Sequence, residues 1–147
     1  MSLPHLFIDT NILIYAHDLD AGIKREIGSQ FVEALFRRPY PPAVSVQILN
    51  ELYVNILRKG SSKSAADICE SYTDWEVIPL TIELFRGAVI TRSRYKISFW
   101  DSLVVEASKK ARANRIISED LSHGQEYCGI EVVNPFKLGA DWKQAML

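Results

Sequence analysis

The sequence has few of the residues that build disulfide scaffolds, zinc sites or membrane spans. It contains two cysteines and three histidines in 147 residues. Cys69 and Cys128 are far apart and form no CxxC pair, so neither a disulfide framework nor a zinc site is predicted. No apolar run approaches the ~20 residues that a membrane helix needs. We therefore expect no membrane partner, and we interpret the scattered histidines as structural or exposed.

The chain also lacks an excess of charge of one sign. Its formal net charge is −1, so attraction to a polyanion must come from local basic patches or bound cations. The N-terminus has no basic region followed by an apolar stretch, so no signal peptide is predicted and we expect a cytoplasmic protein. The length and the hydrophobic fraction of 48% fit one ordinary globular domain spanning residues 1–147.

What the sequence does contain is a regular alternation of short apolar runs and amphipathic stretches. Strands are predicted at 6–8, 43–45, 75–80, 115–118 and 131–133. Helices are predicted at 12–17, 23–37, 46–59, 62–74, 82–95 and 98–114. Such alternation implies parallel strands with helices on both faces, which is a three-layer α/β domain. The last residues, 136–147, are left without a predicted element.

The chain is organised around the segment that runs from the first strand into the first helix. Leu6-Phe7-Ile8 is followed by Asp9-Thr10-Asn11, whose side chains favour local hydrogen bonds over a longer strand. Ligands of open α/β sheets bind at the carboxyl ends of the strands, so Asp9 is predicted to lie in a functional crevice. A helix cap formed by Asp9 or Asn11 is the alternative explanation.

Three further carboxylates are expected to gather near Asp9. Asp120 follows the strand at 115–118, and Asp101 lies in the first turn of the helix that Ser98 opens. Glu51 lies on the flank of the helix at 46–59, whereas Glu119 is expected to point away from Asp120. Each acid has a simpler explanation as a cap, a turn former or a solvated helix residue. Together they would repel each other unless a cation compensates, and Mg²⁺ and Mn²⁺ prefer carboxylate ligands.

The types of residue present narrow the chemistry. An all-acidic magnesium site suits phosphoryl groups, because the metal bridges substrate oxygens and activates water. The sequence has no histidine pair for attack by a 2′-hydroxyl, no P-loop lysine motif and no glycine-rich dinucleotide turn. Water attack on a phosphodiester is therefore predicted. Arg92 and Arg94 are candidates for gripping the substrate, while Trp100 is expected in the core.

Several of these segments resemble the motifs of PIN-domain ribonucleases. Residues 7–16 resemble the opening motif, 98–104 the third acidic motif, 118–124 the fourth, and 133–136 the usual ending, while Asn50-Glu51-Leu52 matches the helix-borne glutamate. The similarity extends over about residues 5–136, and the chain resembles the VapC-type toxins of toxin–antitoxin pairs.

The resemblance implies a five-stranded parallel sheet, endoribonuclease activity dependent on Mg²⁺ or Mn²⁺, a homodimer, and an antitoxin whose segment blocks the acidic groove. It carries the catalytic and metal-binding roles onto Asp9, Glu51, Asp101 and Asp120. Asp9 and Asp101 are expected to bind the metal directly, and Glu51 and Asp120 to complete the site through water or a second ion. Thr10 or Asn11 and Ser118 would orient the carboxylates or a metal-bound water.

Two other classes of protein remain open on the sequence. A metal-dependent phosphatase of the haloacid-dehalogenase type would want Asp-x-Asp-x-Thr, whereas Asp9 is followed here by Thr10-Asn11. An inactive PIN-like module that binds RNA or an ion would use the same acids without cleavage. A receiver-like module would also need a lysine at a downstream strand end, and none is well placed.

Overall fold

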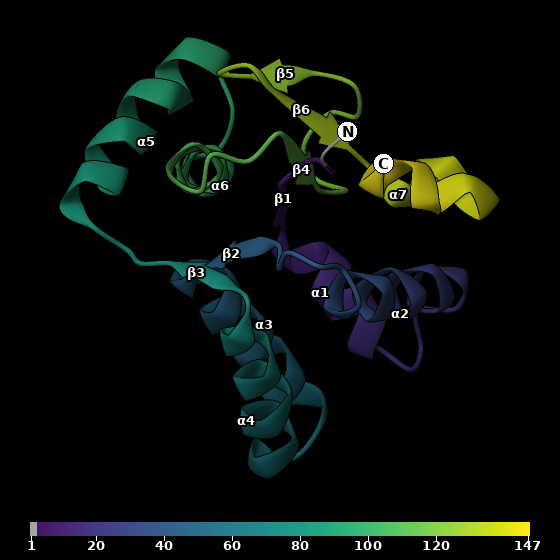
Figure 1. Ribbon diagram of the computed structural model, residues 1–147. Helices are drawn as coiled ribbons and strands as arrows, with labels where there is room; N and C mark the ends of the chain where they lie inside the picture. Colours follow the sequence, from purple (N-terminus) through teal and green to yellow (C-terminus); the bar gives the residue numbers. More distant parts are fainter. Residues whose placement is uncertain (1–2) are drawn as a thin grey trace.

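The computed structural model describes residues 3–147, and its strands and helices alternate along the chain (Figure 1). In chain order the elements are β1 Leu6–Ile8, α1 Thr10–His17, α2 Ile23–Phe36, β2 Ala43–Ser45, α3 Val46–Lys59, α4 Ser62–Ser71, the 3₁₀ turn η1 Tyr72–Asp74, β3 Glu76–Ile78, α5 Ile82–Tyr95, α6 Phe99–Lys110, β4 Arg115–Ile117, β5 Glu126–Tyr127, β6 Ile130–Val133, α7 Pro135–Leu138 and the 3₁₀ segment η2 Gly139–Met146.

Within residues 3–147 the strands form one six-stranded sheet with the order β3-β2-β1-β4-β6-β5. Five neighbouring strands are parallel, which confirms the predicted parallel sheet, and β5 pairs antiparallel with β6 at the edge. The sequence pattern predicts no strand at β5. A strand of two residues is too short to show the alternation of apolar and polar side chains on which strand prediction depends.

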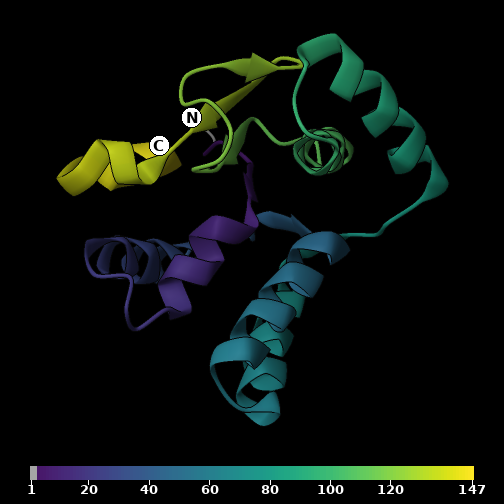
Figure 2. The ribbon, with the colours of Figure 1, turned by 180° about the vertical axis from the view of Figure 1, so that it is seen from behind.

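The helices cover both faces of the sheet, as the three-layer prediction requires. In both views α1 and α2 lie on one side of the strands, and α5 and α6 lie on the other (Figures 1 and 2). The chain moves outward from β1 to β2 and β3, and then returns through α5 and α6 to β4 on the other side of β1. The strand order therefore reverses between β1 and β4, which is where α/β sheets of this kind open a ligand crevice.

Hydrogen-bonded side chains cap the starts of three helices. The side chains of Ser61, Thr81 and Ser98 each accept a hydrogen bond from the backbone amide three residues later, and Ser98 is the helix start that the sequence predicted. The helix predicted to reach residue 114 ends at Lys110. Arg112 adopts a left-handed conformation with φ of 57°, and the amide of Ala113 donates to the carbonyl of Ser108, which closes the helix.

The core lies between the sheet and its helices. Every residue of β1 and β2 is buried, and α2 buries Phe31 and Leu35 as its spacing predicts. The C-terminal segment, for which no element was predicted, packs Trp142 against Phe31 with ring centroids 5.7 Å apart. In the part of the chain that the structure describes, no helix has both the length and the apolar character needed to cross a membrane.

Candidate active site

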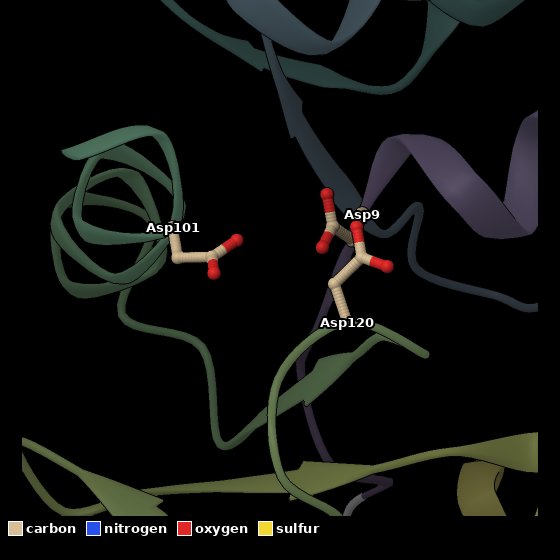
Figure 3. Close-up of side chains that lie close together, drawn as sticks. All are labelled: Asp9, Asp101 and Asp120. Carbon is tan, nitrogen blue, oxygen red and sulfur yellow. The ribbon is translucent and has the colours of Figure 1, made fainter. Parts of the chain in front are cut away.

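Three aspartates from distant parts of the chain converge at the carboxyl ends of β1 and β4. Asp9 follows β1, Asp101 lies in the first turn of α6, and Asp120 follows β4. One carboxylate oxygen of each lies within 4.8 Å of those of the other two. Figure 3 shows Asp101 pointing from α6 towards Asp9 and Asp120. Asp9 is buried, Asp101 is half-buried and Asp120 is exposed, so the cluster is closed to solvent at Asp9 and open to solvent at Asp120.

The floor of the site is built where β1 passes into α1. The backbone amide of Asp9 donates to the carbonyl of Ile117 over 3.0 Å, which joins the ends of β1 and β4. The Asp9 carboxylate accepts a bond from the amide of Thr10 (2.7 Å), so it also caps α1, as the alternative explanation predicted. The hydroxyl of Ser118 donates to Asp9 Oδ2 over 2.7 Å and accepts from the amide of Asp120 over 3.1 Å. Ser118 thus links the two aspartates directly.

Asp101 likewise serves its own helix as well as the cluster. Its backbone amide donates to the Ser98 hydroxyl over 3.0 Å, which caps α6. The cap fixes the direction of the first turn, and the Asp101 carboxylate consequently extends towards the sheet (Figure 3). A carboxylate in the first turn of a helix is also favoured by the helix dipole.

Glu51 lies on α3 and is held by bonds outside the group of three aspartates. The hydroxyl of Thr10 donates to Glu51 Oε2 over 2.7 Å, and the side-chain amide of Gln47 donates to Glu51 Oε1 over 2.8 Å. Both carboxylate oxygens of Glu51 are therefore oriented. The sequence motifs predict an orienting role for Thr10 but not for Gln47. The signal was present, because residues four apart on a helix are neighbours.

The electrostatics of the cluster favour a bound cation. Burial raises the pKa of Asp9 from its ordinary value of 3.8 to about 7, and the charges of Asp120 and Asp101 act in the same direction, while bonds from Ser118 and Thr10 oppose the rise. Burial also raises the pKa of Asp101, to which the charges of Asp120 and Glu51 contribute. A divalent cation would remove this repulsion, and the donor set consists of the oxygens that Mg²⁺ and Mn²⁺ prefer.

The candidate substrate-binding residues lie outside the cluster. Arg92 lines a shallow depression of about 400 Å³ with Ser93, Lys96 and Ile97, at the end of α5. The guanidinium of Arg94 lies 5.0 Å from the centroid of the neighbouring Tyr95 ring. Both arginines are exposed.

The prediction that Trp100 lies in the core is wrong. Its side chain is 63% exposed, and its ring packs edge-on against Phe99 at 5.5 Å. The helical stripe that buries Leu103, Val104 and Ala107 does not extend back to Trp100. The indole is therefore presented on the surface one residue before Asp101.

Glu119 points away from the aspartates, in the direction predicted. Its carboxylate contacts Tyr15 on α1 and Lys24 on α2 and is absent from the group of three. Asn11 lies between the two sets of acids, since its side-chain amide donates to Asp9 Oδ2 over 3.3 Å and its carbonyl oxygen accepts from the amide of Glu119 over 3.0 Å.

Fold and site together define an α/β domain with an acidic cluster at the carboxyl edge of a parallel sheet. The family model "PIN domain" matches residues 6–124, and the chain belongs to this family of nucleases. No curated protein matches the sequence.

Solved structures similar to this chain include toxins and toxin–antitoxin complexes. A toxin–antitoxin complex from Klebsiella pneumoniae is 25% identical, with 89% of this chain and 97% of that chain covered and a TM-score of 0.64. VapC20 of Mycobacterium tuberculosis, a toxin that cleaves the sarcin–ricin loop, is 16% identical, with 78% and 89% covered and a TM-score of 0.65. VapBC2 from Rickettsia felis, bound to a DNA fragment from its promoter, is 15% identical, with 88% and 97% covered and a TM-score of 0.63.

Proposed function

We propose that this protein is a metal-dependent endoribonuclease and the toxin of a toxin–antitoxin pair, acting as one domain over residues 1–147. The observation that carries the proposal is the convergence of Asp9, Asp101 and Asp120, with one oxygen of each within 4.8 Å of the others. Mutual repulsion makes such a group costly unless a cation compensates. Membership of the PIN domain family makes cleavage of a nucleic-acid phosphodiester the reaction that best uses it.

Asp9, Asp101 and Asp120 would hold Mg²⁺ or Mn²⁺, which when bound polarises the scissile phosphate and lowers the pKa of water. Asp9 sets the position of the group, because the bonds from Thr10 and Ser118 fix both of its carboxylate oxygens. Glu51 completes the site from α3. Its oriented carboxylate is suited to accept a proton from the attacking water.

The RNA would approach past basic side chains whose positive charge offsets the repulsion between its phosphates and the acidic cluster. Arg92 and Arg94 supply positive charge on the last turns of α5, where they would contact phosphates on either side of the cut. The exposed Trp100 offers a face on which an unpaired base can stack beside Asp101. Single-stranded or looped RNA fits this combination better than a regular duplex.

Two protein partners belong to the proposal. The K. pneumoniae and R. felis neighbours are complexes of a toxin with its antitoxin, and we assign this chain a cognate antitoxin whose segment occupies the acidic groove. We also assign it a homodimer. α5 buries Leu84, Ala88 and Thr91 on one side and exposes four apolar side chains on the other, namely Ile82, Phe85, Val89 and Ile90. An apolar outer face of this kind is typical of an interface.

The test is cleavage of total RNA by purified protein with Mg²⁺, with Mn²⁺ and with EDTA. Asp9→Asn and Asp101→Asn should each lower the rate by at least about 100-fold, because the charge that holds the cation is lost. Asp67→Asn is the matched control, since Asp67 is an exposed acid on α4 remote in the fold from the cluster, and it should cleave like the wild type. Cleavage by Asp9→Asn at the wild-type rate would refute the assignment.

Two measurements distinguish the competing functions: the chemistry of the RNA product ends and the activity on a generic phosphate ester. RNA products that carry a 5′-phosphate support water attack, whereas products that carry a 2′,3′-cyclic phosphate contradict it. Hydrolysis of a generic phosphate ester without RNA cleavage favours a phosphatase. Binding of RNA without any cut, in the presence of Mn²⁺, favours an inactive binding module.

A further inference from the structure

Glu119, the residue before Asp120, is held from three directions by α1 and α2. Its backbone amide donates to Asn11 Oδ1 over 3.0 Å. Its carboxylate accepts a bond from the Tyr15 hydroxyl over 2.8 Å and forms an ion pair with Lys24, whose Nζ lies 2.6 Å from Glu119 Oε2. These contacts join the segment after β4 to two helices that the sequence places more than 90 residues away.

The ion pair between Lys24 and Glu119 is shielded more than an ordinary surface pair. The side chain of Glu119 is 22% exposed and that of Lys24 is 41% exposed. Lys24 Nζ lies 4.8 Å from the centroid of the Tyr15 ring and 5.7 Å from that of Phe136, and the two rings pack edge-on at 5.3 Å. Fully exposed pairs contribute little, whereas a pair resting on aromatic faces gains a cation–π contribution and loses some screening.

Asp120 needs such support more than the other two aspartates. Asp9 caps α1 and Asp101 belongs to α6, but Asp120 lies in the segment after β4, outside any helix or strand. Repulsion from Asp9 and Asp101 acts to move it outwards, and its side chain is exposed to solvent. Its backbone amide is held by the Ser118 hydroxyl over 3.1 Å. The residue directly before it, Glu119, provides a second anchor through its contacts with α1 and α2.

We infer that Glu119, together with Lys24 and Tyr15, is a positioning unit that holds Asp120 facing Asp9 and Asp101 before any cation binds. The inference rests on the proposed metal site. It goes beyond that site because neither Lys24 nor Tyr15 contacts the three aspartates. Preorganising the third carboxylate spares the cation the cost of ordering the segment, and loss of such outer support typically weakens metal binding by 10- to 100-fold.

The decisive variant is Lys24→Met, which removes the charge and keeps the side-chain stem on the Tyr15 ring. Mn²⁺ affinity, measured by the electron paramagnetic resonance signal of free Mn²⁺, should fall about tenfold. Lys24→Arg keeps the charge and should restore most of the affinity. Lys59→Met is the matched control, because it breaks an ion pair of similar geometry, Lys59 to Asp18 at 2.8 Å, between α3 and the end of α1. The control should bind Mn²⁺ like the wild type.

A second measurement needs no metal. In EDTA, hydrogen–deuterium exchange of the amides at residues 118–121 should be several-fold faster in Lys24→Met than in the wild type or in Lys59→Met. Wild-type exchange together with wild-type Mn²⁺ affinity in Lys24→Met would overturn the inference. If the wild type itself binds no Mn²⁺, the proposed function fails, and the exchange comparison alone then decides whether Lys24 holds the segment.

Discussion

Asp9 has two tasks whose demands conflict. As the cap of α1 it accepts hydrogen bonds that favour its charged form, yet burial and two neighbouring carboxylates favour its neutral form. Burial prevails, and the pKa of Asp9 in the fold is about 7 against an ordinary value of 3.8. The folded state therefore binds a proton more tightly than the unfolded state. The stability that this proton contributes is fully present below pH 3.8 and is lost as the pH rises through about 7.

The first prediction is a stability that falls with pH in the metal-free protein. In EDTA, the free energy of unfolding should decrease between about pH 4 and pH 7, by at most about 4 kcal/mol at about 1.4 kcal/mol per pKa unit. The side chain of Asp9→Asn stays neutral, so this variant should lose most of the pH dependence of the free energy of unfolding. Urea unfolding at a series of pH values measures this dependence in the wild type and in the variant. An equally steep fall in Asp9→Asn would show that another group is responsible. Saturating Mg²⁺ should abolish the fall in the wild type, because the cation requires the charged form.

Gln47 illustrates a second effect at the scale of single residues, because its only described partner is the Glu51 carboxylate. Gln47 is 7% exposed, and a buried amide of this kind orients whatever it binds. Gln47→Met keeps the volume and removes the bond to Glu51 Oε1. We expect kcat for RNA to fall about tenfold with little change in KM, since the bond acts on the group proposed to accept the proton of water.

A double-mutant cycle checks that Gln47 acts through Glu51. In a Glu51→Gln background, Gln47→Met should have no further effect on kcat. An equal loss in both backgrounds would mean that Gln47 has another role. Thermal unfolding of the single variant serves as the control for general damage to α3.

At the scale of elements, Gly87 marks the place where α5 closely approaches a side chain of α6 that is constrained by hydrogen bonds. A Cβ added at Gly87 would lie 2.6 Å from Glu106 Oε2, a carboxylate that accepts bonds from the buried hydroxyl of Thr91 and from Lys109 through its other oxygen. Gly87→Ala should therefore displace Glu106 and weaken its bond with Thr91. We expect a net loss of about 1 kcal/mol of unfolding free energy, because the weakened bond outweighs the better helix propensity of alanine.

In a Glu106→Ala background, Gly87→Ala is expected to raise the free energy of unfolding instead of lowering it. With the carboxylate gone, Gly87→Ala has room, and its helix propensity should raise stability by about 0.5–1 kcal/mol over Glu106→Ala alone. Urea unfolding of the four proteins measures both steps. A stabilising Gly87→Ala in the wild-type background would show that Glu106 moves aside without cost.

The elements that sequence patterns predicted well are those whose signals are local. The strand at Leu6–Ile8 and the cap at Ser98 depend on neighbouring residues, and the structure places them as predicted. The end of α6 depends on Arg112 adopting a left-handed conformation that non-glycine residues rarely adopt. An arginine at this position therefore gives no sequence signal that the helix ends there. Partners such as Lys24 for Glu119 depend on the tertiary fold, and no spacing along the chain reveals them.

The candidate site was predictable for a related reason. Asp9, Asp101 and Asp120 each follow a strand or open a helix, so the topology of an α/β sheet alone brings such positions to one edge. The exposure of Trp100 was not predictable in the same way. An apolar residue one position before a helical stripe is as compatible with the surface as with the core, and the packing of α6 decides between them.

At the scale of the whole molecule, the surface of α5 is the feature that the isolated chain leaves unexplained. Its outward side chains Ile82, Phe85, Val89 and Ile90 are 55%, 50%, 47% and 68% exposed. Phe85 also contacts Phe99 at the start of α6, with ring centroids 5.9 Å apart, so the apolar face continues onto the first turn of α6. Pairing two copies through this face would bring two active sites into one assembly.

The last prediction concerns this proposed dimer. In a two-fold interface each copy contributes the same patch, so Phe85→Glu places two charges in the contact and the loss counts twice. With about 2 kcal/mol or more for each central aromatic, dimer affinity should fall roughly a thousandfold, and sedimentation should show a monomer of the chain mass, 16.7 kDa. Leu19→Glu, which changes an apolar residue 80% exposed away from α5, should leave the dimer intact. A wild type that sediments as a monomer at high concentration would refute the dimer. A Phe85→Glu protein that remains a dimer would show that the interface lies on another face of the molecule.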